Sequence, residues 1–304
     1  MTDKIINGLI DKRSVHGVNS GFKRLDKYIR GFQGGCSYLF SGLEKSGKTT
    51  FLINIISNMI NKKKRVGLVS TELDLTQIAR KLGKINKIDD SDPEKLNDYR
   101  EKLEWYLDYS GNEEGQLNTE GLIDVEKLLK QIRQKADAGC EVIFIDNLTV
   151  IQNQATWQAM SSAGQKIVTL TKQLKCAVVV VAHTKPHNIS FKETPNGVKN
   201  LLAENRSEEI FEDQATVIMR PSTIDVYGGG GYASQFDGVI LFWRPFQKFG
   251  ARHLKEQCAV VVDSLRELAD SQGSNLVKLK FDSKLERYIE LPLTKDEQEK
   301  LIFS

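Results

Sequence analysis

Residues 41–50 read Ser-Gly-Leu-Glu-Lys-Ser-Gly-Lys-Thr-Thr, and this stretch decides the fold that we expect. It matches the pattern G-x-x-x-x-G-K-[ST], in which backbone N–H groups surround a phosphate while a lysine and a hydroxyl hold the outer phosphates and magnesium. A β-type run, Cys36 to Phe40, enters the loop, and residues 51–56 leave it with helical character. The phosphates would therefore lie at a helix N-terminus, which favours negative charge. The residues expected to contact a nucleotide are Gly42, Glu44, Lys45, Ser46, Gly47, Lys48, Thr49 and Thr50.

The composition indicates a soluble globular protein. The chain has 304 residues, 40% of them hydrophobic, which is enough for one large domain or two small ones. A formal net charge of +3 is too small to indicate nucleic acid binding, so any DNA contact must come from local lysines or from several subunits together. The four cysteines are far apart and border apolar runs, which indicates reduced core residues. With no signal-peptide region or membrane-length apolar segment, we expect a cytoplasmic protein, in the host cytoplasm if a phage encodes it.

The apolar pattern predicts alternating strands and helices. Helices are predicted over residues 75–85, 124–138 and 159–174. Strands are predicted over residues 66–72, 105–109, 142–146, 177–182 and 238–243, followed by hairpin-type strands over 259–262 and 276–281. The charged stretch 89–102 is expected to be peripheral. We therefore expect an α/β fold with a mostly parallel twisted sheet, flanked by helices and ending in antiparallel strands.

Three of these strands end at polar side chains that could take part in catalysis or metal binding. In parallel α/β sheets, ligands bind beyond the carboxyl ends of the strands. Glu72 would polarise a water molecule beside a γ-phosphate, or it is a solvated residue at a helix start. Asp146 would orient the water shell of magnesium together with Thr49, or it caps a helix. His183 would contact the γ-phosphate and report its loss, or it is a structural histidine.

Two further segments lie outside the expected sheet. Residues 1–19 carry apolar side chains at helical spacing, and they form either a linker that docks on a neighbouring subunit or a terminus that caps its own domain. Residues 185–232 form a long polar segment that includes four consecutive glycines, and such segments are usually functional or mobile. This segment would hold single-stranded DNA. The lysines that would contact DNA phosphates, unless they are only solvated, are Lys185, Lys192 and Lys199.

The ordered motifs resemble those of a known family, the hexameric replicative DNA helicases of the DnaB type, in their RecA-like ATPase domain. The resemblance covers roughly residues 21–288 and includes the approach to the phosphate loop over residues 20–35. The stretch Ala182 to Pro186 is closer to the phage primase-helicase and Twinkle branch, which carries histidine where bacterial DnaB carries glutamine. The motifs that carry the resemblance are the loop at 42–50, Glu72, Asp146, His183 and Gln235.

This resemblance implies roles for four further residues. Gln235 would couple phosphate sensing to DNA, and Arg244 and Phe281 would stack on the nucleotide base. Arg266 would be an arginine finger that reaches the neighbouring subunit's site. The alternative for Arg266 is a surface arginine that pairs with a nearby acid.

The resemblance also implies an activity and an assembly. Residues 20–304 would form one RecA-like ATPase domain that hydrolyses ATP or another NTP with Mg²⁺ and moves along single-stranded DNA. The protein would form a ring, a hexamer, with a primase or a helicase loader as a further partner. One alternative is a RecA- or RadA-like recombinase or recombination mediator, which forms open filaments. The other is a nucleotide-binding regulatory protein without unwinding activity.

Overall fold

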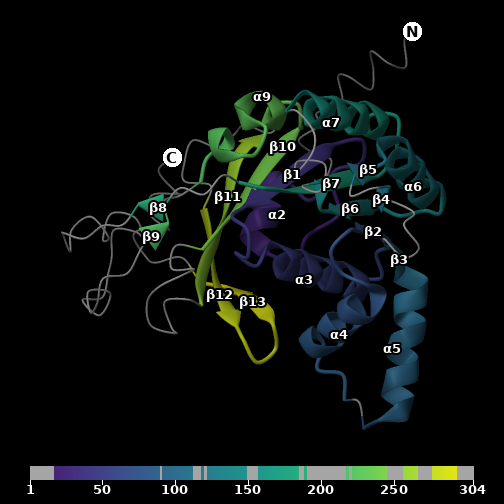
Figure 1. The fold of residues 1–304 in the computed structure, drawn as a ribbon. Coiled ribbons are helices and arrows are strands. Elements are labelled where there is room, and N and C mark those ends of the chain that lie inside the picture. The colour runs from purple at the N-terminus through teal and green to yellow at the C-terminus, as the bar shows by residue number, and fades with distance from the viewer. Residues whose placement is uncertain are drawn as a thin grey trace, which may run out of the picture.

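A single large sheet organises the protein in the computed structural model (Figure 1). The structure describes residues 17–89, 91–111, 118–119, 122–148, 157–184, 188–189, 217–218, 221–244, 256–265 and 276–292. The sheet has nine strands in the order β13-β12-β11-β10-β1-β7-β6-β2-β3. Their bounds are β1 (Ser37–Gly42), β2 (Val66–Ser70), β3 (Leu107–Ser110), β6 (Val142–Asp146), β7 (Ala177–His183), β10 (Gly238–Trp243), β11 (Gln257–Leu265), β12 (Leu276–Asp282) and β13 (Arg287–Glu290).

The direction of the strands divides the sheet in two. From β10 through β1, β7, β6 and β2 to β3 all neighbours pair in parallel, whereas β10, β11, β12 and β13 pair antiparallel. The mostly parallel sheet with antiparallel C-terminal strands is therefore confirmed. Four short strands make two separate pairs, β4 (Asn118–Thr119) with β5 (Leu122–Ile123) and β8 (Asn188–Ile189) with β9 (Val217–Ile218).

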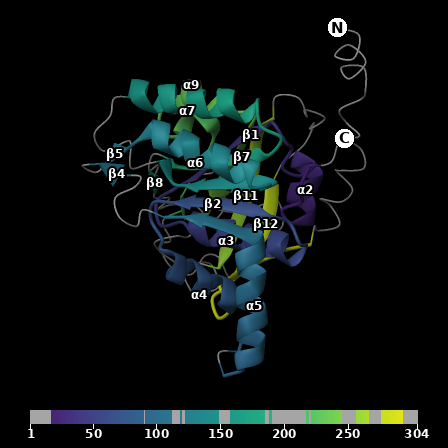
Figure 2. The same cartoon turned by 90° about the vertical axis from the view of Figure 1, so that its right-hand side faces the viewer.

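Helices cover both faces of the sheet, α3 and α4 on one face and α6, α7 and α9 on the other (Figures 1 and 2). Helix α2 packs with the first group, because its Leu25 and Ile29 join the same apolar cluster. Within the described ranges, no helix combines the length and the apolar character that crossing a bilayer requires. The helices are α2 (Lys23–Ile29), α3 (Lys48–Asn61), α4 (Leu75–Ile85), α5 (Pro93–Tyr106), α6 (Val125–Asp137), α7 (Trp157–Thr171), α9 (Gly229–Ala233) and the 3₁₀ turn η5 (Thr223–Asp225).

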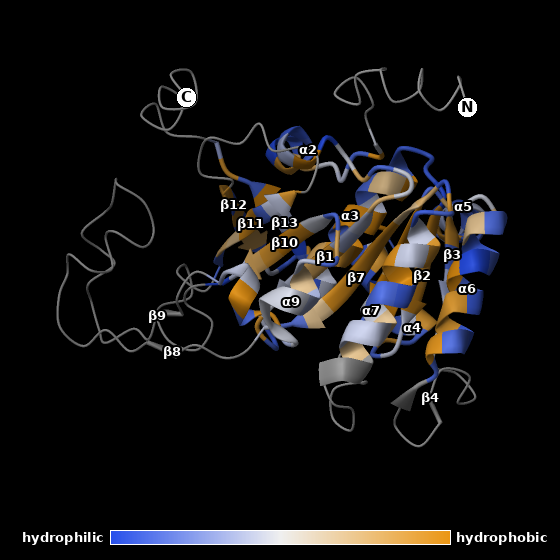
Figure 3. Cartoon of the chain, turned by 90° about the horizontal axis from the view of Figure 1, so that it is seen from above, coloured by the Kyte–Doolittle hydropathy of each residue, from blue (hydrophilic) through white to orange (hydrophobic). Residues whose placement is uncertain are grey.

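The core lies in two layers, one on each side of the sheet. Successive strand residues alternate between the layers, so that Phe40 of β1 packs in the layer with α3 and Leu39 in the layer with α6 and α7. Because both faces are covered, β6 and β7 are apolar up to their last residues, Asp146 and His183, as Figure 3 shows for β7. This explains why their sequences read as continuous apolar runs, and why the strands predicted at 142–146, 177–182 and 238–243 agree with β6, β7 and β10.

The strand predicted at 105–109 is partly wrong. Trp105 and Tyr106 end helix α5, and β3 begins only at Leu107. Helix α5 starts at a favourable site, since Asp92 accepts a hydrogen bond from the Lys95 amide at 3.2 Å and proline follows it. The helix has no buried residue, and the exposed fraction of Trp105 is 72%. The stretch 89–102 is thus peripheral as expected, but its helix was not predicted, and Trp105 and Tyr106 were wrongly placed in the strand that follows.

The two segments expected outside the sheet lie mostly beyond what the structure describes. Of the N-terminal segment 1–19, residues 1–16 lie outside the described residues, so its docking or capping role stays a prediction. Of the segment 185–232, only residues 188–189, 217–218 and 221–232 are described. The part that returns to the domain contains η5 and α9, and Tyr232 of α9 is buried in the layer with α7.

Two glycines in helix interiors make a matched pair for a stability test. A Cβ at Gly164 in α7 would lie 2.6 Å from the Tyr232 ring, whereas at Gly83 in α4 it would meet nothing within 4 Å. We expect Gly83→Ala to raise the free energy of unfolding by about 0.5–1 kcal/mol, because alanine favours the helix. Gly164→Ala should lower it by about 1–3 kcal/mol, since overpacking outweighs the same gain. Urea unfolding of both variants measures this, and equal shifts would contradict the packing at α7.

Candidate nucleotide-binding site

The phosphate loop joins the central strand β1 to helix α3. Strand β1 ends at Gly42 and α3 begins at Lys48, so the free N–H groups of the first helical turn border the loop. Gly47 has φ 104°, a conformation that favours glycine, and a Cβ at Gly42 would lie 2.5 Å from the Phe242 carbonyl oxygen. These two positions explain why the motif requires glycine there.

Lys48 points back into the loop rather than into solvent. It is 4% exposed, and its Nζ donates a hydrogen bond to the Leu43 carbonyl at 2.7 Å. Burial lowers the pKa of Lys48 to about 8, although the negative charges of Asp146, Glu72 and Glu44 act in the opposite direction. A phosphate bound in the loop would replace the carbonyl as the partner of this ammonium group and would favour its charged form further. By contrast, the side chains of Glu44 and Lys45 are exposed and pair with each other at 3.8 Å.

Asp146 lies at the end of β6 and is 2% exposed. Burial, together with the charge of Glu72, raises the pKa of the Asp146 carboxyl to about 7. Its Oδ1 has no hydrogen-bond partner among the described residues, while the Thr49 side chain hydrogen-bonds the same carboxylate. A buried, unpaired carboxylate oxygen beside a hydroxyl fits a magnesium ion, which prefers oxygen ligands. No group of three or more metal-binding side chains occurs in the described part of the chain, so phosphate and water oxygens would complete the shell.

Glu72 follows β2 by two residues, at the same edge of the sheet. Strands β2 and β6 are parallel neighbours with Ser70 opposite Asp146, which brings the two acids together. The Glu72 side chain is exposed, and its carboxylate accepts a hydrogen bond from the Asn147 side-chain amide. Asn147 was not predicted, because only its place after Asp146 distinguishes it in the sequence.

His183 lies opposite Gly42 across the β1–β7 pair, directly beside the loop. Burial, followed by the charge of Lys48, lowers the pKa of His183 to about 4, so its ring is neutral at physiological pH. Its Nδ1 is buried and has no hydrogen-bond partner among the described residues. Gln235 is turned toward α7, where its Nε2 donates to the Ser161 hydroxyl at 2.5 Å. Its expected role in coupling to DNA stays a prediction.

The residues expected at the base lie on the antiparallel side of the sheet. The Arg244 guanidinium lies 6.0 Å from the centre of the Phe281 ring, and Phe281 in turn lies 4.8 Å from the ring of Tyr288. The Tyr288 hydroxyl donates to the Gly47 carbonyl at 3.3 Å. Tyr288, for which no role was predicted, therefore links the Arg244–Phe281 pair to the phosphate loop.

The hairpin of β12 and β13 is fixed to the helices of the site. At its turn, Glu286 pairs with Lys81 and Lys84 of α4, each at 2.8 Å. Asn54 of α3 donates to the Glu286 carbonyl at 2.9 Å and accepts from the Tyr288 amide at 3.1 Å. The hairpin and α3 thus form one connected unit. Four predicted site residues lie outside the described residues, namely Lys185, Lys192, Lys199 and Arg266.

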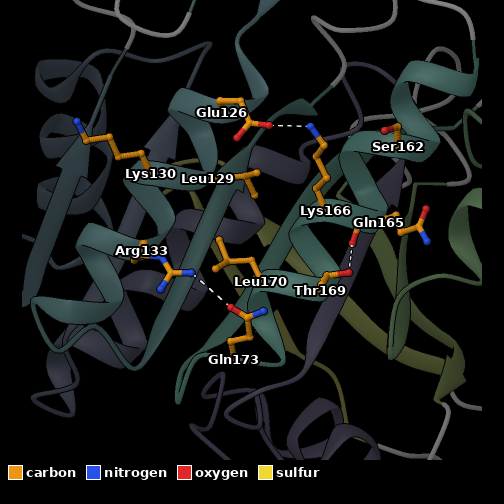
Figure 4. Close-up of a pocket in the computed structure, with 10 residues that line it drawn as sticks. All are labelled: Glu126, Leu129, Lys130, Arg133, Ser162, Gln165, Lys166, Thr169, Leu170 and Gln173. Atoms are coloured by element: carbon orange, nitrogen blue, oxygen red, sulfur yellow. Dashed lines mark hydrogen bonds and ion pairs between the residues drawn. The ribbon is translucent and has the colours of Figure 1, made fainter.

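A groove of about 810 Å³ lies elsewhere, between α6 and α7 (Figure 4). An ion pair joins Glu126 to Lys166 across it at 2.7 Å, and Arg133 donates to Gln173 at 3.4 Å. None of the predicted nucleotide-site residues lines this groove. It is therefore separate from the nucleotide site.

The raised pKa of Asp146 predicts a pH dependence of stability in the absence of nucleotide. The unfolded chain loses this proton near pH 3.8, whereas the folded protein keeps it until about pH 7. Between these values the folded state binds more protons, so the free energy of unfolding should fall as the pH rises. Asp146→Asn removes the titration and should flatten this part of the curve. Urea unfolding between about pH 4 and 7 compares the two proteins, and parallel curves would contradict the buried environment of Asp146.

The strand order and the loop between β1 and α3 define an α/β fold of the phosphate-loop type. Residues 17–196 match the model of the DnaB-like helicase C-terminal domain, and the chain belongs to this family. It is 23% identical over 293 residues to the replicative DNA helicase DnaB of Helicobacter pylori, covering 94% of this chain and 52% of the relative. The chain thus spans about half the length of the curated relative.

Two solved structures share the fold. A solved ATPase domain matches with a TM-score of 0.65 and 17% identity, covering 96% of both chains. A DnaB-like replicative helicase, described with its interactions with primase, matches with the same score and identity over 96% of this chain and 66% of its own. The expected RecA-like fold and the expected family are therefore confirmed.

Proposed function

We propose that this chain is the motor domain of a ring-forming replicative DNA helicase, which hydrolyses ATP or another NTP and moves along single-stranded DNA. One observation carries the proposal. Lys48, Glu72 and Asp146 come from three separate segments and meet at one edge of the sheet, where the charge of Glu72 acts on the pKa values of both Lys48 and Asp146. All three lie within the part of the chain that matches the helicase family.

The residues suggest a division of labour in hydrolysis. A water oxygen would bond to the γ-phosphorus while the bond to the β–γ bridging oxygen breaks, releasing ADP and phosphate. Glu72 would accept the proton that the water loses. Lys48 would neutralise the β- and γ-phosphates, and the neutral His183 ring beside Gly42 would contact the γ-phosphate.

Magnesium would be held by the Thr49 hydroxyl and, through water, by Asp146. When bound, the ion would supply positive charge that stabilises the phosphates during hydrolysis. On the other side of the site, Arg244 and Phe281 would hold the base, because a guanidinium over an aromatic ring makes a flat apolar and cationic surface.

A ring would place each site at a boundary between subunits, with Arg266 of one subunit acting on the nucleotide of the next. We expect Arg266→Ala alone to be nearly inactive in phosphate release. Mixed with Lys48→Ala, it should regain part of the activity, since some boundaries then pair an intact loop with an intact arginine. Wild-type activity of Arg266→Ala alone would dismiss the finger. Absence of recovery in confirmed mixed rings would also dismiss action between subunits.

Binding to DNA would depend on assembly. The formal net charge of one chain is only +3, whereas a ring would gather several copies of Lys185, Lys192 and Lys199 around one strand. One structural neighbour is described with its interactions with primase. We therefore propose a primase or a helicase loader as a partner of this chain. The protein would act in the cytoplasm.

The test combines imaging with activity. Purified protein is imaged with single-stranded DNA and a non-hydrolysable ATP analogue, and its ATPase and unwinding of a forked duplex are measured with and without Mg²⁺. Closed rings, hydrolysis that DNA stimulates and that needs Mg²⁺, and strand separation are the expected results. Open filaments with strand exchange would instead support a recombinase. Nucleotide binding without hydrolysis or unwinding would support a regulatory protein.

A further inference from the structure

Asn147 is a buried polar residue beside the acids of the candidate site. It directly follows Asp146 at the end of β6 and is 1% exposed. Its side-chain Nδ2 donates a hydrogen bond to Oε1 of Glu72. Among the described residues, this is the only hydrogen bond to the Glu72 carboxylate. A buried amide would therefore control the direction in which an exposed carboxylate points.

The backbone around Asn147 is fixed from the β2 side. The Asn147 backbone amide donates to the Thr71 hydroxyl at 3.2 Å, and this hydroxyl also lies 3.2 Å from the Asn147 carbonyl. The Thr71 amide donates to the Asp146 carbonyl at 2.7 Å. Thr71 precedes Glu72 and Asp146 precedes Asn147 in the chain, so these contacts hold the two side chains in register.

Glu72 needs such an anchor because its own surroundings do not fix it. Its side chain is exposed and lies near the Asp146 carboxyl, whose pKa the charge of Glu72 helps to raise. A long flexible side chain at an exposed position would otherwise take several rotamers, and ordering them again would cost entropy. One oxygen held by a neutral amide leaves the other oxygen free, and the amide adds no competing charge.

We propose that Asn147 is a positioning residue for the catalytic carboxylate: it holds Oε1 of Glu72 so that Oε2 can accept the proton of the attacking water. This inference rests on the proposed ATP hydrolysis. It assigns Asn147 no contact with the nucleotide, which separates it from Lys48 and Thr49. The alternative is a purely structural role, in which the Asn147 side chain stabilises the end of β6 and does not affect the position of Glu72.

The first experiment separates turnover from binding. We expect Asn147→Ala in the full chain to lower kcat roughly 10- to 100-fold while KM for ATP changes less than about threefold, because misplacement of a reacting group affects the chemical step. Asn147→Asp keeps the size, loses the donor and adds a charge, and it should lose at least as much. The matched control is Asn86→Ala, which removes a side-chain amide bonded to Ser57 and Tyr99 at 2.8 Å each. The control should lose stability and keep kcat.

The second experiment asks whether Asn147 acts through Glu72. In a Glu72→Gln background, adding Asn147→Ala should leave the residual hydrolysis unchanged, since the carboxylate that Asn147 positions is already gone. A further loss of roughly 10- to 100-fold would overturn the proposal and assign Asn147 a separate structural effect. Unchanged kcat in both folded Asn147 variants would also overturn it. If the wild-type protein itself failed to hydrolyse ATP, the proposed function would fall instead, so the two failures are distinct.

Discussion

Lys48→Ala is expected to reduce ATP hydrolysis at least roughly 100-fold, the scale seen when one charge-stabilising group is removed from an active site. The reason is geometric as well as electrostatic. Lys48 is buried at the start of α3, and no other lysine of the described loop points inward, since the Lys45 side chain is 86% exposed. Phosphate release under saturating ATP and Mg²⁺ measures the effect.

The matched control for this variant is Lys62→Ala. Lys62 is an exposed lysine at the opposite end of the same helix, so its removal changes the net charge equally. We expect near-normal turnover from it. Near-normal turnover from a folded Lys48→Ala protein would remove the phosphate loop from the mechanism and with it the assignment of the whole site.

Glu72→Gln should bind nucleotide and assemble normally but hydrolyse about 10²- to 10⁴-fold more slowly, because the amide keeps the shape and cannot accept a proton. Binding of a fluorescent ATP analogue and phosphate release are measured on the same preparation. Glu104→Gln serves as the control, since this glutamate of α5 has a side chain 67% exposed and far from the loop in sequence. If binding collapsed and residual turnover followed occupancy, Glu72 would have a structural role.

The parts of the fold that were predicted correctly share one physical property. Strands β6, β7 and β10 are covered on both faces, so their sequences are apolar runs. The polar residue at which each run stops indicates where the strand ends. Helix α4 has the bounds that were predicted from its helical character, and the structure adds a capping box of Asp74 and Gln77 at its start. The position of Asp146 at the edge of the sheet could be predicted for the same reason, because it is the first charged residue after an apolar run.

The parts that were missed depend on contacts between distant segments. Helix α5 buries no residue, so no periodic apolar face identifies it. Helix α2 is only seven residues long, and its Arg24 attaches it to the sheet by pairing with Glu290 of β13 at 3.1 Å. Strand β13 itself was not predicted. The bond between Asn147 and Glu72 joins the ends of two strands that are neighbours only in the folded sheet. A single sequence contains no pattern for such pairs.

The attachment of the β12–β13 hairpin to α3 and α4 has a consequence for how the site opens. Lys81 and Lys84 of α4 pair with Glu286, and Asn54 of α3 hydrogen-bonds the backbone at Glu286 and Tyr288, so the hairpin cannot separate from both helices without losing all of these contacts. Amide hydrogens of β13 and of α3 should therefore exchange with solvent through one shared opening. The two halves of the nucleotide would then meet a preassembled surface. In the proposed site, the base and the phosphates would therefore bind and leave together.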